Sequence, residues 1–198
     1  YGATGASVID VSDYVHFTGS TATGRKVGVA CAEQLKPFSL ELGGKDPAIV
    51  LADADVERAA NGIAWGGMFN SGQVCVSVER VYVEAPVYDE FVARLTENVR
   101  KLQQGSESAP GLTFDVGAMA TAAQRDIVAR HVDEATEAGA RVLAGGKPAG
   151  RGTFFQPTVL ADVTPEMTCI AEETFGPTLP VVKGADEGVA VRLANDSK

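Results

Sequence analysis

The chain has 198 residues, of which 45% are hydrophobic and 22% are charged, proportions that are ordinary for a folded globular protein. A net charge of −9 disfavours a nucleic-acid partner, because binding to phosphate backbones needs a basic surface. No run of about 18 apolar residues occurs, so the sequence predicts no membrane-spanning helix and no membrane partner.

Cysteine and histidine are sparse in this chain. Cys31, Cys75 and Cys169 lie far apart in the sequence, which predicts no disulfide framework and a reducing compartment, the cytoplasm. His16 and His131 do not create a metal-ligand spacing with them, so no metal site is expected. We regard both histidines as structural or solvated. The chain opens without a basic-then-apolar leader, so we expect no signal peptide.

Short apolar runs alternate with stretches of helical periodicity. The predicted strands cover residues 14–20, 37–42, 47–52, 80–85 and 141–146. The predicted helices cover residues 24–35, 56–72, 87–103 and 121–138, with Ser20 or Thr21 capping the first and Asp53 or Asp55 the second. A loop rich in Gly, Ser and Pro is expected near residues 105–111. This alternation predicts an α/β fold with a largely parallel sheet. A domain boundary is expected at Gly43-Gly44, where two glycines permit a sharp change of direction.

The stretch "GSTATGRK" first suggests a nucleotide-binding loop. A P-loop needs Lys and then Ser or Thr directly after its last glycine, whereas Arg25, Lys26 and Val27 follow Gly24 here. The P-loop interpretation therefore fails. A glycine turn between a strand and a helix start can still bind a phosphate on backbone N–H groups, although an ordinary turn is the plainer interpretation of this element alone.

Glu41 interrupts the apolar strand in "LELGGKDP". Apolar surroundings raise the pKa of a carboxyl group toward a value useful to a general base. The alternative is an exposed strand glutamate. The following glycines, Gly43 and Gly44, favour the first interpretation because they leave room for a ligand.

The stretch "FNSGQVCVSVER" places Cys75 between a flexible Gly-Gln approach and a strand-like run. A thiol attacks as its thiolate, which a helix start, a cation or a base can favour. A buried, inert cysteine is the alternative, and it is the interpretation that we favour for Cys31 and Cys169. On the helix before Cys75 we expect Trp65 to pack in the core rather than to contact a substrate.

The stretch "CIAEETFGPTLPV" places two acidic residues, Glu172 and Glu173, before Phe175. Two carboxylates beside an aromatic ring can hold the hydroxyl pair of a ribose. A charged turn before a strand is the plainer interpretation.

Taken together, "FTGSTATG", "LELGGKDP", "FNSGQVC" and "EETFGP" resemble the NAD(P)-dependent aldehyde dehydrogenase superfamily in order and approximate spacing. The resemblance runs from about residue 14 to the last residue, and "CVSVERVYV" is most similar to a bacterial succinate-semialdehyde dehydrogenase branch. An arginine often found before the Gly-Gln pair in that branch is missing here. Complete family members are about two and a half times as long, so the chain resembles an internal fragment.

The resemblance implies a mechanism. Cys75 would attack the aldehyde to give a thiohemiacetal, and its backbone N–H would help to hold the oxyanion. Hydride transfer to the cofactor, NAD or NADP, would leave a thioester. Glu41 would then activate the water that releases the carboxylic acid.

The resemblance also implies cofactor contacts and a domain organisation. Gly19 and Ser20 would form the phosphate-contacting turn, Leu42 and Gly43 would help to place the carboxamide, and Glu173 and Phe175 would contact the nicotinamide ribose and ring, respectively. Residues 1–43 would be the end of a Rossmann-type cofactor domain. Residues 44–198 would be a catalytic α/β domain truncated at its C-terminus. The complete protein would form a homo-oligomer, a dimer or tetramer, and the isolated chain would be inactive.

Two alternatives remain open. The chain can be a non-catalytic remnant or interaction module that lacks half of the cofactor site. It can also belong to a coenzyme A-acylating aldehyde dehydrogenase, although such relatives commonly lack the glutamate that is present here as Glu41.

Overall fold

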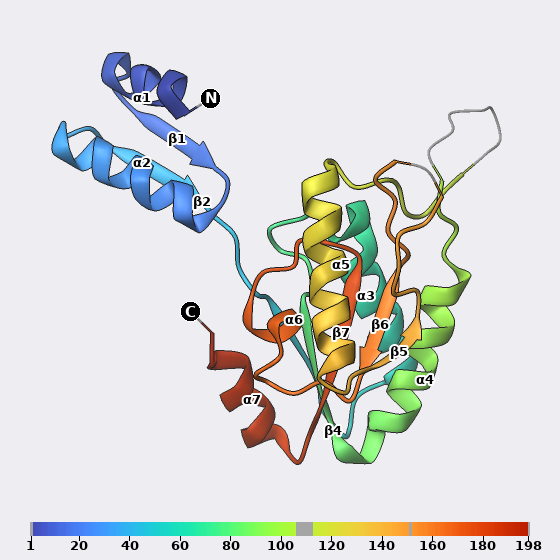
Figure 1. Cartoon of the computed structure of the whole chain (residues 1–198). Helices are drawn as coiled ribbons and strands as arrows, with labels where there is room; N and C mark the ends of the chain where they lie inside the picture. The colour runs from blue at the N-terminus through green and yellow to red at the C-terminus, as the bar shows by residue number, and fades with distance from the viewer. Residues whose placement is uncertain (1, 106–112, 151, 198) are drawn as a thin grey trace. The chain divides into compact units, whose positions relative to one another are not determined.

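The computed structural model in Figure 1 describes residues 2–105, 113–150 and 152–197. The chain divides into two compact units, Tyr1–Gly44 and Lys45–Lys198. Each unit has its own sheet, and each is described separately. Apart from Gly105, the Gly, Ser and Pro-rich loop expected near 105–111 lies outside the described residues.

The first unit is a small α/β element with two parallel strands. Its elements are α1 (Gly2–Val11), β1 (Val15–Thr18), α2 (Thr21–Glu33) and β2 (Phe38–Glu41). Val15 of β1 pairs with Phe38 of β2, and Thr18 pairs with Glu41. Helix α2 packs against both strands and approaches them closely at Gly24, where a Cβ would lie 2.4 Å from Leu42 Cδ2. A larger residue at this position would require the Leu42 side chain to move.

The second unit contains a five-stranded sheet in the order β3-β4-β7-β6-β5. Its strands are β3 (Pro47–Val50), β4 (Arg80–Glu84), β5 (Arg141–Ala144), β6 (Thr158–Ala161) and β7 (Thr178–Gly184). Its helices are α3 (Val56–Met68), the 3₁₀ turn η1 (Phe69–Gly72), α4 (Ala85–Lys101), α5 (Ala122–Glu137), α6 (Thr168–Ala171) and α7 (Glu187–Asn195). All neighbouring strands run parallel except β5, which is antiparallel to β6.

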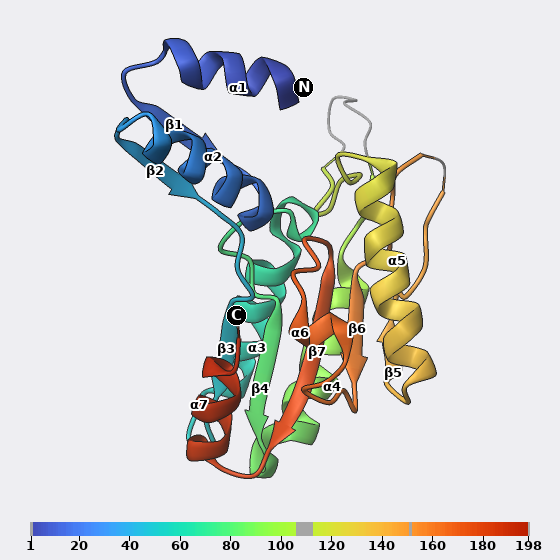
Figure 2. The ribbon, with the colours of Figure 1, turned by 60° about the vertical axis from the view of Figure 1, so that its left-hand side comes forward.

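Helices cover both faces of this sheet, as Figures 1 and 2 show. Successive residues of β4 point to opposite faces: Val81 and Val83 belong to the cluster with α3 and α4, whereas Tyr82 belongs to the cluster with α5, α6 and α7. This alternation is the period of two that a strand imposes. A sheet covered on both faces accounts for the almost continuous apolar runs of its strands.

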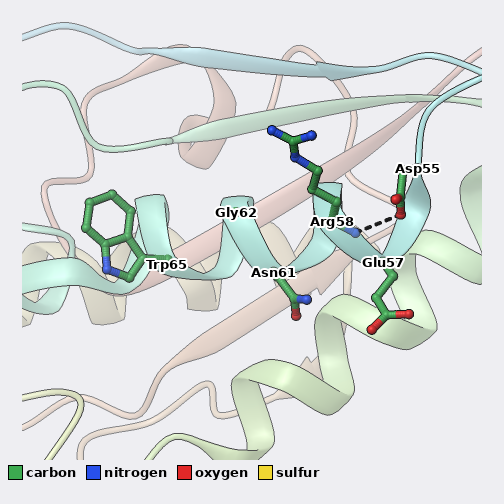
Figure 3. Close-up of a pocket in the computed structure, with 6 residues that line it drawn as sticks. All are labelled: Asp55, Glu57, Arg58, Asn61, Gly62 and Trp65. Carbon is green, nitrogen blue, oxygen red and sulfur yellow. Dashed lines mark hydrogen bonds between the residues drawn. The ribbon is translucent and has the colours of Figure 1, made fainter.

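Two predicted N-caps are confirmed. The Ser20 side chain accepts a hydrogen bond from Thr23 N, and the Asp55 side chain accepts one from Arg58 N. Figure 3 shows the Asp55 cap at one end of a surface hollow along α3, with Trp65 at the other end. A side-chain oxygen that satisfies an unpaired N–H group fixes where each helix begins.

Several details differ from the sequence-based expectations. Helix α3 ends at Met68 rather than continuing to residue 72, because Asn70 and Ser71 adopt left-handed backbone conformations. Strand β5 ends at Ala144, since Gly145 has a φ of +67°. Trp65 is 69% exposed, so the expected core packing of this side chain is wrong.

Candidate active site

Cys75 lies in a turn between η1 and β4 and is exposed to solvent. The turn is closed by a hydrogen bond from Ser77 N to Val74 O of 2.9 Å. Cys31 and Cys169 are buried, as predicted, and all three cysteines are free thiols. Burial raises the pKa of Cys169 to about 11, which keeps that thiol protonated. Burial of Cys75, which the alternative interpretation expected, is not found, and Cys75 is the exposed one of the three cysteines.

The approach to Cys75 is a run of left-handed residues. Asn70, Ser71 and Gly72 have φ values of +52°, +59° and +68°. Such conformations cost about 1–3 kcal/mol for non-glycine residues and persist only where surrounding contacts enforce them. The Asn70 side chain supplies one such contact, because its Nδ2 donates to Gln73 O at 3.0 Å. This loop therefore presents Cys75 in a defined conformation.

Two distant segments pack against this loop. A Cβ on Gly72 would lie 2.1 Å from Gly176 O, so the two backbones are in direct contact. Ser71 Oγ donates to Gly117 O at 2.9 Å. The amide of Ala120 donates to Gln73 Oε1 at 2.9 Å. The structure thus brings the "FNSGQVC" and "EETFGP" motifs together beside residues 117–120.

The segment containing the paired acids follows the short helix α6. Glu172 is exposed, whereas Glu173 and Phe175 are half-buried. Phe175 has a φ of +50°, an unusual conformation for a bulky residue. Glu173 and Phe175, both predicted as cofactor contacts, therefore lie on a segment that packs against the approach to Cys75 through Gly72 and Gly176.

A buried ion pair supports this segment, and the sequence analysis missed both of its members. Glu79 Oε1 accepts the amide of Phe175 at 2.7 Å, and Glu79 Oε2 accepts the amide of Thr174 at 2.8 Å. Lys45 Nζ donates to Glu79 Oε2 at 2.7 Å and to Thr174 Oγ1 at 3.1 Å. The sequence offered one signal for this pair: Lys45 directly follows a glycine pair, and Glu79 directly precedes an apolar strand.

The polar network continues to His131, which is buried as a structural histidine. Its Nδ1 lies 3.1 Å from Thr174 Oγ1, and its Nε2 lies 3.8 Å from Glu172 Oε2. Burial, reinforced by the nearby Arg130, lowers the pKa of His131. Burial also lowers the pKa of Lys45, although its Glu79 partner opposes this shift. The network therefore has a neutral imidazole at one end and a buried ion pair at the other.

The remaining predicted site residues belong to the first unit. Glu41 is the last residue of β2 and is exposed, so the apolar surroundings expected for its carboxylate are not found. Gly19 N donates to Glu41 O at 3.0 Å, which occupies one amide of the expected phosphate turn. Ser20 caps α2, and Leu42 and Gly43 are half-buried residues after β2. Glu41 and Cys75 thus lie in different units.

The part of the chain that the structure describes contains neither a metal-binding cluster nor a membrane-spanning helix. No group of three or more His, Cys, Asp and Glu residues there is arranged to hold a metal ion. No helix there combines the length and apolar character that crossing a bilayer requires.

Comparison with known proteins defines the class of protein to which this fold and site belong. The model of the aldehyde dehydrogenase family matches residues 7–198. The chain belongs to the aldehyde dehydrogenase family. The expected α/β fold is confirmed by a lactaldehyde dehydrogenase structure from Escherichia coli, which superimposes with a TM-score of 0.89 at 44% identity, covering 93% of this chain and 39% of that one.

Two curated relatives are similar to almost the whole of this chain. A putative succinate-semialdehyde dehydrogenase [NADP(+)] 2 of Mycobacterium tuberculosis is 42% identical over 195 residues, which are 98% of this chain and 37% of the relative. A 4,4'-diapolycopene aldehyde oxidase of a Methylomonas species is 47% identical over 197 residues, 99% of this chain and 36% of the relative. The chain therefore spans little more than a third of the length of these relatives.

Proposed function

We propose that this chain forms the thiol-bearing part of an enzyme that oxidises an aldehyde to a carboxylic acid with NAD or NADP. The observation that carries the proposal is the position of Cys75, an exposed thiol on a constrained turn whose approach contacts the "EETFGP" segment. Membership of the aldehyde dehydrogenase family supports the reaction class. The name of the mycobacterial relative, which includes NADP(+), supports the cofactor class.

The residues present fit a dinucleotide. Helix α2 has 13 residues and begins directly after Ser20, so its N-terminal N–H groups and dipole favour a phosphate. Because Gly19 N is occupied by Glu41 O, Ser20 and the first turn of α2 would supply these contacts. The Glu173 carboxylate would accept hydrogen bonds from ribose hydroxyls, with Phe175 beside the nicotinamide. Leu42 and Gly43 would help to place its carboxamide. When bound, the cofactor accepts the hydride.

The chemical step at Cys75 uses its thiolate. The sulfur forms a bond to the aldehyde carbon, and the carbonyl oxygen takes up the negative charge of a thiohemiacetal. The backbone N–H of Cys75 stabilises this oxyanion. After hydride loss the substrate carbon remains bound to Cys75 as a thioester. Its hydrolysis breaks the carbon–sulfur bond, returning the thiolate and releasing the acid.

We assign the hydrolytic step to Glu41. Its carboxylate would take a proton from water as the oxygen attacks the thioester carbon. Glu41 is exposed on the first unit, so water can reach its carboxylate. A glutamate at this position also favours hydrolysis over transfer of the acyl group to coenzyme A.

The wider assignments follow from the same proposal. Residues 1–43 would be the end of the cofactor domain and residues 44–198 most of the catalytic domain. Succinate semialdehyde is the first substrate to assay, given the mycobacterial relative. We further propose a cytoplasmic homo-oligomer and, because the chain spans about 37% of that relative, no activity for the 198 residues alone. A non-catalytic interaction module is the alternative that inactivity of the longer protein would favour.

Replacement of Cys75 tests the proposal. Cys75→Ala in the protein at its full genomic length should abolish aldehyde-dependent NAD(P)H formation while leaving the fold intact. Cys31→Ala is the matched control, because it removes a thiol that is buried in the other unit. Retained dehydrogenase activity in Cys75→Ala would overturn the assignment.

A further inference from the structure

The carboxylate of Glu79 holds the backbone of the segment that follows Glu173. Each of its two oxygens accepts one main-chain amide, from Phe175 at 2.7 Å and from Thr174 at 2.8 Å. Both distances are those of charge-assisted hydrogen bonds. Two adjacent amides held by one carboxylate fix the direction of the chain at this point, which a single hydrogen bond does not do.

The contact places two charged side chains, those of Glu79 and Lys45, in the protein interior, where the loss of hydration costs free energy. The side chains of Glu79 and Lys45 are only 6% and 4% exposed. Buried ion pairs contribute little net stability, because desolvation offsets their attraction. Phe175, moreover, is held at a φ of +50°, a conformation that a bulky residue avoids. The attraction between the two charges therefore does not explain their burial, whereas the two amides that Glu79 accepts point to a role in fixing the conformation of this segment.

The position of Glu79 in the chain links two parts of the candidate site. It lies four residues after Cys75 and immediately before β4, while its partners at Thr174 and Phe175 are 95 and 96 residues away. The amide of Glu79 donates to Asp46 O at 3.0 Å, which anchors this residue to the start of β3. Glu79 thus couples the Cys75 turn to the segment that contains Glu173.

We propose that Glu79 is a positioning residue for cofactor binding, with Lys45 as its buried counter-ion. Glu79 holds the Glu173–Phe175 segment in the conformation that receives the nicotinamide ribose. This inference rests on the proposed function, because it assigns Glu79 to the cofactor side of that site. Its action is indirect: Glu79 orders the residues that contact the cofactor.

The variant Glu79→Gln tests this role. Its side-chain carbonyl can accept only one of the two amides, while its NH2 group faces the other amide as a second donor. In the protein at its full genomic length, we expect KM for NAD(P)+ to rise about tenfold, as the loss of one charge-assisted hydrogen bond implies. The rate of Cys75 alkylation by iodoacetamide should not change.

Two control variants separate positioning from stability. Leu95→Ala removes a fully buried side chain from the α4 core and should lower stability without changing the cofactor KM. Adding Lys45→Met to Glu79→Gln removes the unpaired buried cation, so the double variant should regain stability but keep the raised cofactor KM. An unchanged cofactor KM in Glu79→Gln, or an equal rise in Leu95→Ala, would overturn the proposal.

Hydrogen exchange provides a readout that does not depend on activity. The peptide covering 172–178 should exchange faster in Glu79→Gln than in the wild-type protein, whereas peptides of α4 should exchange at the same rate. Unchanged exchange in 172–178 would overturn the proposal at the level of structure. If the wild-type protein reduced no NAD(P)+, the proposed function would fail. Faster exchange of peptide 172–178 in Glu79→Gln would then show that Glu79 holds this segment, but its role in cofactor binding would be overturned.

Discussion

Gly72 and Gly176 are in direct backbone contact: a Cβ on Gly72 would lie 2.1 Å from the carbonyl oxygen of Gly176. Gly72 also has a φ of +68°, so two independent constraints require glycine at this position. The first residue belongs to the approach to Cys75 and the second to the segment after Phe175. Through this contact, two motifs about a hundred residues apart form one candidate site.

Gly72→Ala should therefore destabilise the protein and lower its activity. The left-handed conformation together with the clash against backbone atoms should cost about 2 kcal/mol or more in the free energy of unfolding. Gly62→Ala is the matched control, because Gly62 lies in α3 with open space around its Cα. That control should stabilise the helix by about 0.5–1 kcal/mol. Urea denaturation measures both, and equal effects of the two substitutions would contradict the close contact.

The exposure of the cysteines predicts selective labelling. In the folded protein iodoacetamide should modify Cys75, whereas Cys31 and Cys169 should react only after denaturation. For Cys169 the pKa of about 11 reinforces the effect of burial, because almost no thiolate is present at neutral pH. Peptide mass spectrometry before and after denaturation measures the difference. Native labelling of Cys169 at the rate of Cys75 would show that the core around it is open.

The buried imidazole of His131 predicts a loss of stability in acid. Its pKa in the folded protein is lowered by burial and by Arg130, whereas in the unfolded chain the pKa returns to about 6.5. Between these two values the unfolded state binds more protons than the folded state, so stability falls as pH decreases below about 6.5. Lys45 opposes protonation, and Glu172 and Glu134 favour it.

His131→Gln should flatten this part of the pH dependence. Denaturation midpoints between pH 5 and 8 should fall less steeply for this variant than for the wild-type protein. His16→Gln is the control, since His16 is exposed and lies in the first unit. An unchanged slope in His131→Gln would mean that other groups cause the acid sensitivity.

Glu41→Gln should separate the two halves of the proposed reaction. The amide cannot take a proton from water, so thioester hydrolysis should slow about 100-fold or more, while the first turnover of hydride transfer proceeds. Stopped-flow measurement should then show a burst of NAD(P)H followed by a slow steady state. Glu33→Gln, at the end of α2, should behave as the wild-type enzyme. Loss of the burst with fast hydrolysis retained would assign Glu41 to another step.

Local signals in the sequence were sufficient for much of the fold. Ser20 and Asp55 were predictable N-caps because a cap depends on residues only three positions away. The strand at residues 80–85 was predictable from its apolar run, although only the structure shows which helices Val81 and Tyr82 pack against. Such features depend on short-range patterns, which a sequence displays directly.

Features that depend on distant partners were not predictable in this way. Glu79 looks like any charged residue before a strand, since its two amide partners lie 95 and 96 residues further along the chain. Trp65 is a large apolar residue that was expected in the core, but it is 69% exposed. Glu41 interrupts an apolar strand, yet as the last residue of β2 it is exposed rather than enclosed. Periodicity marks which residues share a face, and it does not say what that face meets.

The central claim is that Cys75 carries the acyl intermediate, and trapping that intermediate tests it most directly. Glu41→Gln, in the protein at its full genomic length, would be mixed with aldehyde and NAD(P)+, quenched in acid and digested for mass spectrometry. We predict that the peptide containing Cys75 gains the mass of the acyl group, in proportion to the NAD(P)H formed in the burst. NAD(P)H formation with Cys75 unmodified, or with the acyl group on another residue, would contradict the account.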